Sequence, residues 1–233
     1  MHPAVFVYAR SDSQRLPGKA MMSLGSAGPL LRIVLTRARM VGTEACALLT
    51  SDRAVDDELA ELGVALGVQV VRGDALNLVQ RTLQAIDSTG ASHFLRVNGD
   101  SPLFSPLLAR QAMTHLNRVG LISNLFERRF PYGVSVEWMA SENYQALAAA
   151  ADDTDCEHVT AHLYRMRTEL STLSMTQVRD DSGLRLALDT QIDYDRLSTL
   201  LSQVNSSLAE YWNLYDMSPP DLIFTHLLRN SQT

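Results

Sequence analysis

Short apolar runs alternate with longer segments of helical periodicity through the first half of the chain. The segments between the runs, at 28–42, 54–67 and 75–90, carry apolar residues at spacings of three and four. This alternation is typical of a parallel sheet covered by helices, so we expect an α/β fold. The apolar runs that predict its strands are AVFVYA (4–9), ACALLTS (45–51), VQVVRG (68–73) and SHFLRVNG (92–99).

The pattern changes after about residue 120, where antiparallel strands are expected to join the sheet. An alanine-rich helix and a second helix beginning near Glu157 separate these strands, which gives a mixed but mostly parallel sheet. A proline pair opens the tail at 218–230 and predicts a helix there. No repeat or linker interrupts the chain, so we expect one domain over 1–233. The later strands are predicted at GLISNLF (120–126), GVSVEWM (133–139) and GLRLALD (183–189).

Composition excludes several classes of protein. With 233 residues, 46% of them hydrophobic, the chain can bury a full core. Its formal net charge of −6 argues against a nucleic-acid or membrane-surface protein, since both usually carry excess Lys and Arg. Cys46 and Cys156 make neither a disulfide framework nor a metal cluster. No apolar run approaches ~20 residues, so we expect no membrane span and a cytoplasmic protein.

The loop ARSDSQRLPGKAMM (9–22) contains the only lysine of the chain, Lys19, although the chain has nineteen arginines. Arginine binds phosphate oxygens with a two-pronged guanidinium, whereas lysine supplies a compact charge. Together with Arg10, Ser13 and Arg15, this lysine suits a triphosphate. A solvated basic loop is the alternative that the pattern alone leaves open.

Two aspartates follow predicted strands, Asp100 in RVNGDSPL and Asp189 in LALDTQIDYD. The carboxyl ends of strands in an open sheet line one crevice, so these carboxylates should converge there and face solvent. Mg²⁺ commonly uses one or two carboxylates and leaves its other positions to substrate and water. A turn residue or helix cap is the alternative for each, and Asp193 favours the first turn of a helix. Typical dehydrogenase, P-loop and α/β-hydrolase motifs do not occur in the sequence.

Five ordered blocks of the sequence resemble one enzyme family. ARSDSQRLPGK is similar to AR-x-x-S-x-RLPGK, RVNGDSPL to R-x-x-GD-x-PL, and RLALDTQIDY to R-x-x-x-DT-x-x-D, while YGVSVEWM and EHVT also match. These motifs resemble the cytidylyltransferases related to spore coat polysaccharide biosynthesis protein F, and more distantly the CMP-sialic acid and CMP-Kdo synthetases. The resemblance implies a nucleotide-diphospho-sugar-transferase-like (GT-A-like) fold. It also implies transfer from CTP, with Mg²⁺, to an acidic sugar of the nonulosonate or ulosonate type, for surface polysaccharide or glycoconjugate synthesis.

The resemblance also assigns site residues. It implies metal binding by Asp100 and Asp189, and catalytic roles for Arg10, Lys19 and Asp100. A homodimer is implied as well, with Tyr132 and Trp138 as candidate apolar contacts. The implied nucleotide contacts are Arg10, Ser13, Arg15, Lys19, Ser51 and Asp52, and the implied sugar-side residues are Glu137, Glu157 and His158.

Two positions depart from the family pattern. Asp12 replaces a small residue beside the proposed phosphates, and Cys156 replaces an arginine that commonly precedes EHVT. These departures leave open a nucleotide-binding pseudoenzyme of the same fold. Because relatives of this fold also use UTP or GTP, a nucleotidyltransferase that uses another NTP is the second alternative. The absence of a GG-x-G-x-R type loop disfavours the second alternative.

Overall fold

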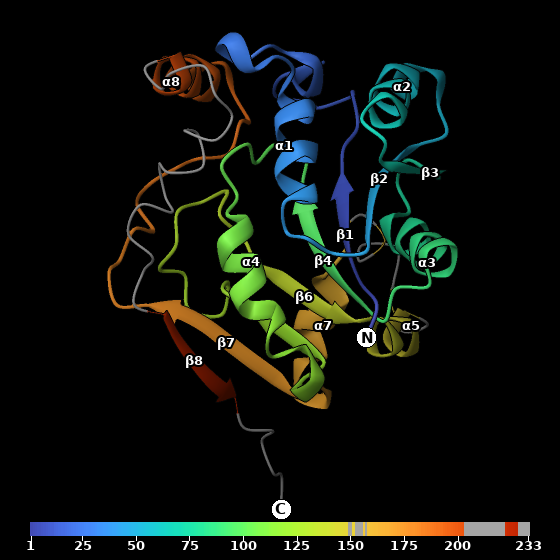
Figure 1. Ribbon diagram of the computed structural model, residues 1–233, viewed down its shortest axis with the longest axis vertical. Helices are drawn as coiled ribbons and strands as arrows, with labels where there is room; N and C mark the ends of the chain where they lie inside the picture. Colours follow the sequence, from blue (N-terminus) through green and yellow to red (C-terminus); the bar gives the residue numbers. More distant parts are fainter. Residues whose placement is uncertain (149–150, 152–155, 157, 203–221, 228–233) are drawn as a thin grey trace, which may run out of the picture.

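A single twisted sheet runs through the computed structural model, which describes residues 1–148, 151, 156, 158–202 and 222–227 (Figure 1). Its strand order is β3-β2-β1-β4-β6-β5-β7-β8. Within the described residues, no helix has the length and apolar character needed to cross a membrane. The strands are β1 (Pro3–Tyr8), β2 (Ala45–Ser51), β3 (Gln69–Gly73), β4 (His93–Asn98), β5 (Leu121–Ser123), β6 (Glu137–Ala140), β7 (Thr172–Gln177) and β8 (Leu222–Leu227).

The four strands predicted in the first half are confirmed and form one parallel block. β1 lies between β2 and β4, and β3 pairs with β2, all in parallel. The strand direction reverses at β6, which is antiparallel to both β4 and β5. β5 is parallel to β7. The predicted mixed, mostly parallel sheet is therefore correct.

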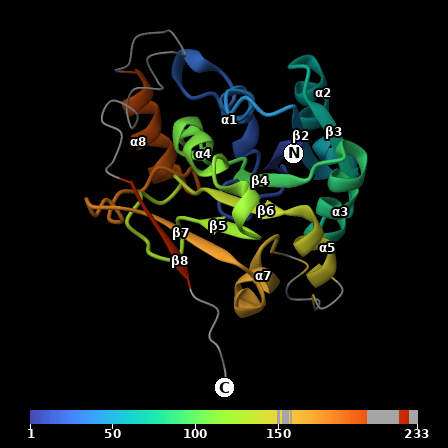
Figure 2. The same cartoon turned by 60° about the horizontal axis from the view of Figure 1, so that its bottom comes forward.

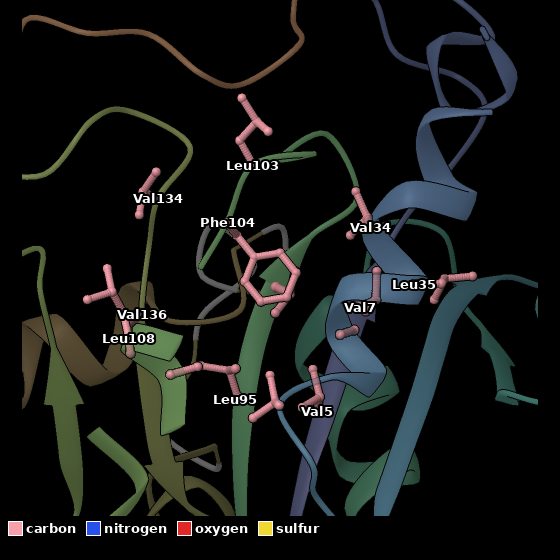
Figure 3. Close-up of a cluster of buried hydrophobic side chains, with 14 of the residues drawn as sticks. Val5, Val7, Val34, Leu35, Leu95, Leu103, Phe104, Leu108, Val134 and Val136 are labelled. Carbon is pink, nitrogen blue, oxygen red and sulfur yellow. The ribbon is translucent and has the colours of Figure 1, made fainter. Parts of the chain in front are cut away.

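Helices cover both faces of the sheet, as Figure 2 shows. Strand residues alternate between two apolar cores: Val5 and Val7 pack with α1 and α4 (Figure 3), whereas Phe6 and Phe94 pack with α3, α5 and α7. This alternation follows from the two-residue period of a strand. The helices are α1 (Leu30–Arg39), α2 (Asp57–Ala65), α3 (Leu78–Thr89), α4 (Pro106–Met113), α5 (Ser141–Ala148), α7 (Ala161–Arg165) and α8 (Gln191–Ser202), with short 3₁₀ turns at Lys19–Met21, Gly25–Ala27, Ala54–Asp56, Leu116–Arg118 and Arg167–Glu169.

In the second half, one predicted strand is wrong and one strand was not predicted. The segment 183–189 forms no strand: it has one isolated bridge, from Arg185 to Tyr132, and its Arg185 and Asp189 side chains form ion pairs. The strand that was not predicted is β7, which pairs with β5 and β8 and whose six residues are all buried. Four of them are Thr, Ser or Gln, which concealed this strand in the sequence.

The tail and one aromatic residue also differ from expectation. Residues 222–227 form strand β8, antiparallel to β7, instead of a helix, because β7 offers an open edge and the segment is rich in residues that favour strands; 218–221 and 228–230 lie outside the described residues. Trp138 is fully buried, and its Nε1 donates to Ala109 O at 2.9 Å. It therefore belongs to the core and offers no apolar surface to a second subunit.

Candidate functional site

A cavity of about 550 Å³ opens at the carboxyl end of β1 and β4. Gly99 lets these strand ends approach closely: its N–H donates to Tyr8 O at 2.8 Å, and an added Cβ would lie 2.8 Å from that oxygen. The chain can therefore turn Asp100 directly into the cavity. Of the predicted site residues, the cavity is lined by Arg10, Ser13, Arg15, Lys19, Asp100, His158 and Asp189.

Lys19 lies at the centre of the polar contacts in this cavity. Its Nζ donates to Asp189 Oδ1 at 2.9 Å, to Asp100 Oδ2 at 3.0 Å and to the carbonyl oxygen of Leu188 at 2.8 Å. Gly18, with a φ of 70°, turns the loop into the 3₁₀ segment that begins at Lys19. An ammonium has three donors, so these three acceptors use all of them.

Asp189 is a buried carboxylate shared by several cations, which corrects the expectation that it faces solvent. Besides Lys19, it binds Arg15 Nη2 at 3.0 Å and Arg185 Nη2 at 2.6 Å, and it accepts a hydrogen bond from Tyr132 at 3.4 Å. Burial by itself would raise the pKa of Asp189, but the Lys19 hydrogen bond and the surrounding positive charges outweigh it and lower that pKa. The carboxylate is therefore held ionised.

The exposed part of the loop is tied to the neighbouring strand end through Asp12. Asp12 pairs with Arg53 at 2.8 Å and with Arg10 Nε at 3.3 Å, and the Arg53 hydrogen bond lowers its pKa. A second tie runs through the buried carboxylate of Asp56, which accepts from the backbone N–H of Ser11 at 2.7 Å. The charge of Asp12 is thus shared by two arginines.

Three other predicted site residues, Ser51, Asp52 and Glu137, do not line this cavity. Ser51 is buried and hydrogen-bonds Asp56, while Asp52 is exposed and does not line the cavity. Glu137 is fully buried, where it binds Arg96 at 2.5 Å and the Tyr164 hydroxyl at 2.9 Å. Glu157 lies outside the described residues.

Sequence reasoning missed two arginines that line the cavity, Arg81 and Arg96. Arg81 is buried on α3, where its guanidinium donates to the carbonyl oxygen of Asp74 and forms no ion pair with a described carboxylate. Burial lowers its pKa. The available signal was its place four residues before Ala85 on the apolar face of the helix, where an arginine is unusual.

Asp100 and Asp189 are arranged so that both carboxylates could bind one divalent cation. Asp100 and Asp189 already direct one oxygen each to a single positive atom, Lys19 Nζ. Over the described ranges, no group of three or more His, Cys, Asp or Glu side chains is placed to hold a metal ion. This donor set fits Mg²⁺, which retains water and phosphate ligands, better than a cation that requires a complete protein cage.

The chain resembles known proteins in both sequence and structure. The chain is similar to the spore coat polysaccharide biosynthesis protein SpsF of Bacillus subtilis (strain 168), at 26% identity over 228 residues, covering 91% of this chain and 93% of that protein. Its structure is similar to that of a cytidylyltransferase from Leptospira borgpetersenii, with a TM-score of 0.82, 25% identity and coverage of 93% and 94%.

A more distant structural likeness extends to the synthetase of CMP-2-keto-3-deoxy-manno-octonic acid, solved with CTP. That comparison gives a TM-score of 0.65 at 16% identity, over 87% of this chain and 99% of the other. It shows that the two proteins share the nucleotidyltransferase (GT-A-like) fold. A family model described as cytidylyltransferase matches residues 4–214, so the chain belongs to the cytidylyltransferase family.

Proposed function

We propose that this protein transfers a cytidylyl group from CTP to an acidic sugar of the nonulosonate or ulosonate type. A hydroxyl oxygen of the sugar forms a bond to the α-phosphorus of CTP. The bond from that phosphorus to the oxygen of the β-phosphate breaks, pyrophosphate departs with the electron pair, and the proton of the sugar hydroxyl passes to solvent. The product is a CMP-sugar for surface polysaccharide or glycoconjugate synthesis.

One observation carries this proposal: cationic and hydroxyl side chains suited to phosphate line the same cavity as two carboxylates from distant segments. Arg10, Ser13, Arg15 and Lys19 come from the loop after β1, and Asp100 follows β4. Positioning and charge neutralisation account for most of the catalysis in phosphoryl-type transfer, so such a set is suited to the reaction. The two loop arginines would hold the triphosphate, and Lys19 would stabilise charge moving onto pyrophosphate.

Asp100 and Asp189 would hold Mg²⁺ in this reaction. When bound, the ion would neutralise charge on the phosphate oxygens. Lys19 shares an oxygen of each carboxylate, so its ammonium lies beside any phosphate held there. The chain thereby offers a fixed positive charge next to the proposed metal ligands.

The contacts of Asp12 favour turnover over a pseudoenzyme. Alone, an aspartate in a phosphate-binding loop would repel the triphosphate. Its pairing with Arg53 and Arg10 offsets this charge, so the loop retains Arg15 and Lys19 as further cations. The departure from the family pattern is therefore compatible with an active site.

Pyrophosphate release and nucleotide binding, measured with Mg²⁺, each of the four NTPs and a panel of acidic sugars, test the proposal. We expect release with CTP and at least one sugar acid, and none with the other NTPs. Tight CTP binding without transfer to any acid would favour the pseudoenzyme. Release with a different NTP would favour the other alternative.

A further inference from the structure

A second cavity, of about 290 Å³, adjoins the first and is enclosed by the segment between β5 and β6. Arg96 and Asn98 of β4 line both cavities. Asn124 shapes the new cavity: its side chain donates to Val134 O at 2.8 Å and accepts from Val136 N at 2.9 Å, which holds both ends of the 125–134 segment. Tyr132 also lines it, and its hydroxyl reaches Asp189 in the first cavity.

The chemistry of this second cavity is that of a site for a hydroxylated anion. No Asp or Glu is among its lining residues in the described part of the chain. Ser135, Ser182 and Asn98 supply hydrogen-bonding groups, while Phe130 and Val134 supply apolar surface. Its volume is near the lower end of the range of about 300–1,000 Å³ usual for small-molecule sites.

Two arginines line the second cavity, and only one of them is paired with a described carboxylate. Arg96 is balanced by the buried carboxylate of Glu137 at 2.5 Å. Arg128 is exposed and forms no hydrogen bond or ion pair with the described residues. The carboxylate of Asp181, whose backbone N–H donates to Arg129 O at 2.8 Å, is occupied by Arg179 at 2.8 Å. Arg128 is therefore the cation with unused donors.

We infer that this second cavity binds the acceptor, and that Arg128 binds the acceptor's carboxylate. The inference rests on the proposed function and deepens it. It names the acceptor class from the cavity itself: a sugar acid whose single carboxylate meets Arg128, while its hydroxyls meet serine and asparagine groups. Arginine is suited to this role because its guanidinium can donate two parallel hydrogen bonds to one carboxylate.

Binding of matched acid and neutral probes tests this assignment. The probes are 3-deoxy-manno-octulosonate and N-acetylneuraminate, each paired with its uncharged C1 amide, and binding is measured by calorimetry on protein saturated with a non-hydrolysable CTP analogue. A charge-assisted contact predicts that at least one acid binds about 10- to 100-fold more tightly than its amide. Arg128→Gln should remove this preference, and Arg128→Lys should restore part of it.

Control measurements distinguish failure of this inference from failure of the proposed function. Arg110 on α4 is also exposed and lines neither cavity, so Arg110→Gln should leave the acid preference unchanged. Retained affinity of Arg128→Gln for the CTP analogue would show that the variant is folded. Equal binding of acids and amides by the wild type, or an unchanged acid preference in Arg128→Gln, would overturn the assignment. Failure of the CTP analogue to bind any variant would count against the proposed function instead.

Discussion

Replacing Lys19 with arginine preserves the charge of the loop but should impair catalysis severely. The Lys19 Nζ meets three acceptors at 2.8–3.0 Å, two of them carboxylate oxygens and one a carbonyl oxygen. These acceptors converge on one atom, and the side chain is only 12% exposed. A guanidinium spreads its donors over a plane, so it cannot direct three of them from one point.

The magnitude depends on how many of these three hydrogen bonds a guanidinium fails to make. If it fails to make at least one of them, the cost is about 1.5–3 kcal/mol, the range for a hydrogen bond that involves a charged group. Where that hydrogen bond supports the transition state, this energy corresponds to a rate loss of roughly 10- to 100-fold. The loss should fall mainly on kcat, because the unchanged loop charge continues to attract CTP.

Steady-state pyrophosphate release gives kcat and the KM for CTP, and calorimetry gives CTP affinity. Lys19→Arg should be compared with Lys19→Ala, and with Arg110→Lys as a swap at an exposed position outside both cavities. We expect Arg110→Lys to behave as the wild type. If Lys19→Arg also turned over at the wild-type rate, the convergent geometry would not explain why this single lysine is present.

Three further predictions concern metal binding, the pH dependence of stability and the oligomeric state. CTP should bind more tightly with Mg²⁺ than without it, and Asp100→Asn should abolish that difference in calorimetry; a persisting difference would exclude Asp100 as a metal ligand. Folding lowers the pKa of Asp189 below its ordinary value of 3.8, so the ionised carboxylate stabilises the fold at any pH above 3.8. This contribution is lost as the pH falls through the lowered pKa. Urea unfolding of Asp189→Asn should therefore show a deficit at pH 7 that shrinks below about pH 4; a pH-independent deficit would contradict this. The protein should sediment as a homodimer at micromolar concentration, with exposed Tyr132 and Leu184 as candidate contacts, and a monomer would refute that expectation.

The parallel half of the sheet could be predicted because its signal is local. Each strand from β1 to β4 is a short apolar run between helices with three- and four-residue spacing, and that spacing reflects which side chains are buried. β7 gave no such signal, because its Thr and Ser residues are buried through sheet contacts that its own sequence does not reveal. The helix predicted for the tail was wrong for a related reason: residues 222–227 form a strand because they pair with the open edge of β7.

The candidate site was predictable in composition but not in its internal contacts. The side chains of Lys19, Asp100 and Asp189 follow loop and strand-end patterns, so their place in one crevice could be anticipated. Their direct binding to one another depends on side-chain reach across three segments, which no sequence pattern encodes. Arg81 escaped notice because an arginine in an amphipathic helix ordinarily extends to solvent.

The hydrogen bonds of Lys19 also determine when, during folding, the site can come into existence. Lys19 is joined to acceptors 81, 169 and 170 residues away along the chain. Interactions of such long range must close large loops, so we expect them to form late, after the strands between them have assembled. A chain truncated before Leu188 would retain the loop after β1 but lose two of the three anchors of its lysine. Only the fully folded chain should therefore bind nucleotide tightly. Because nucleotide binds the folded state in preference to partly folded states, it should stabilise the folded protein against unfolding.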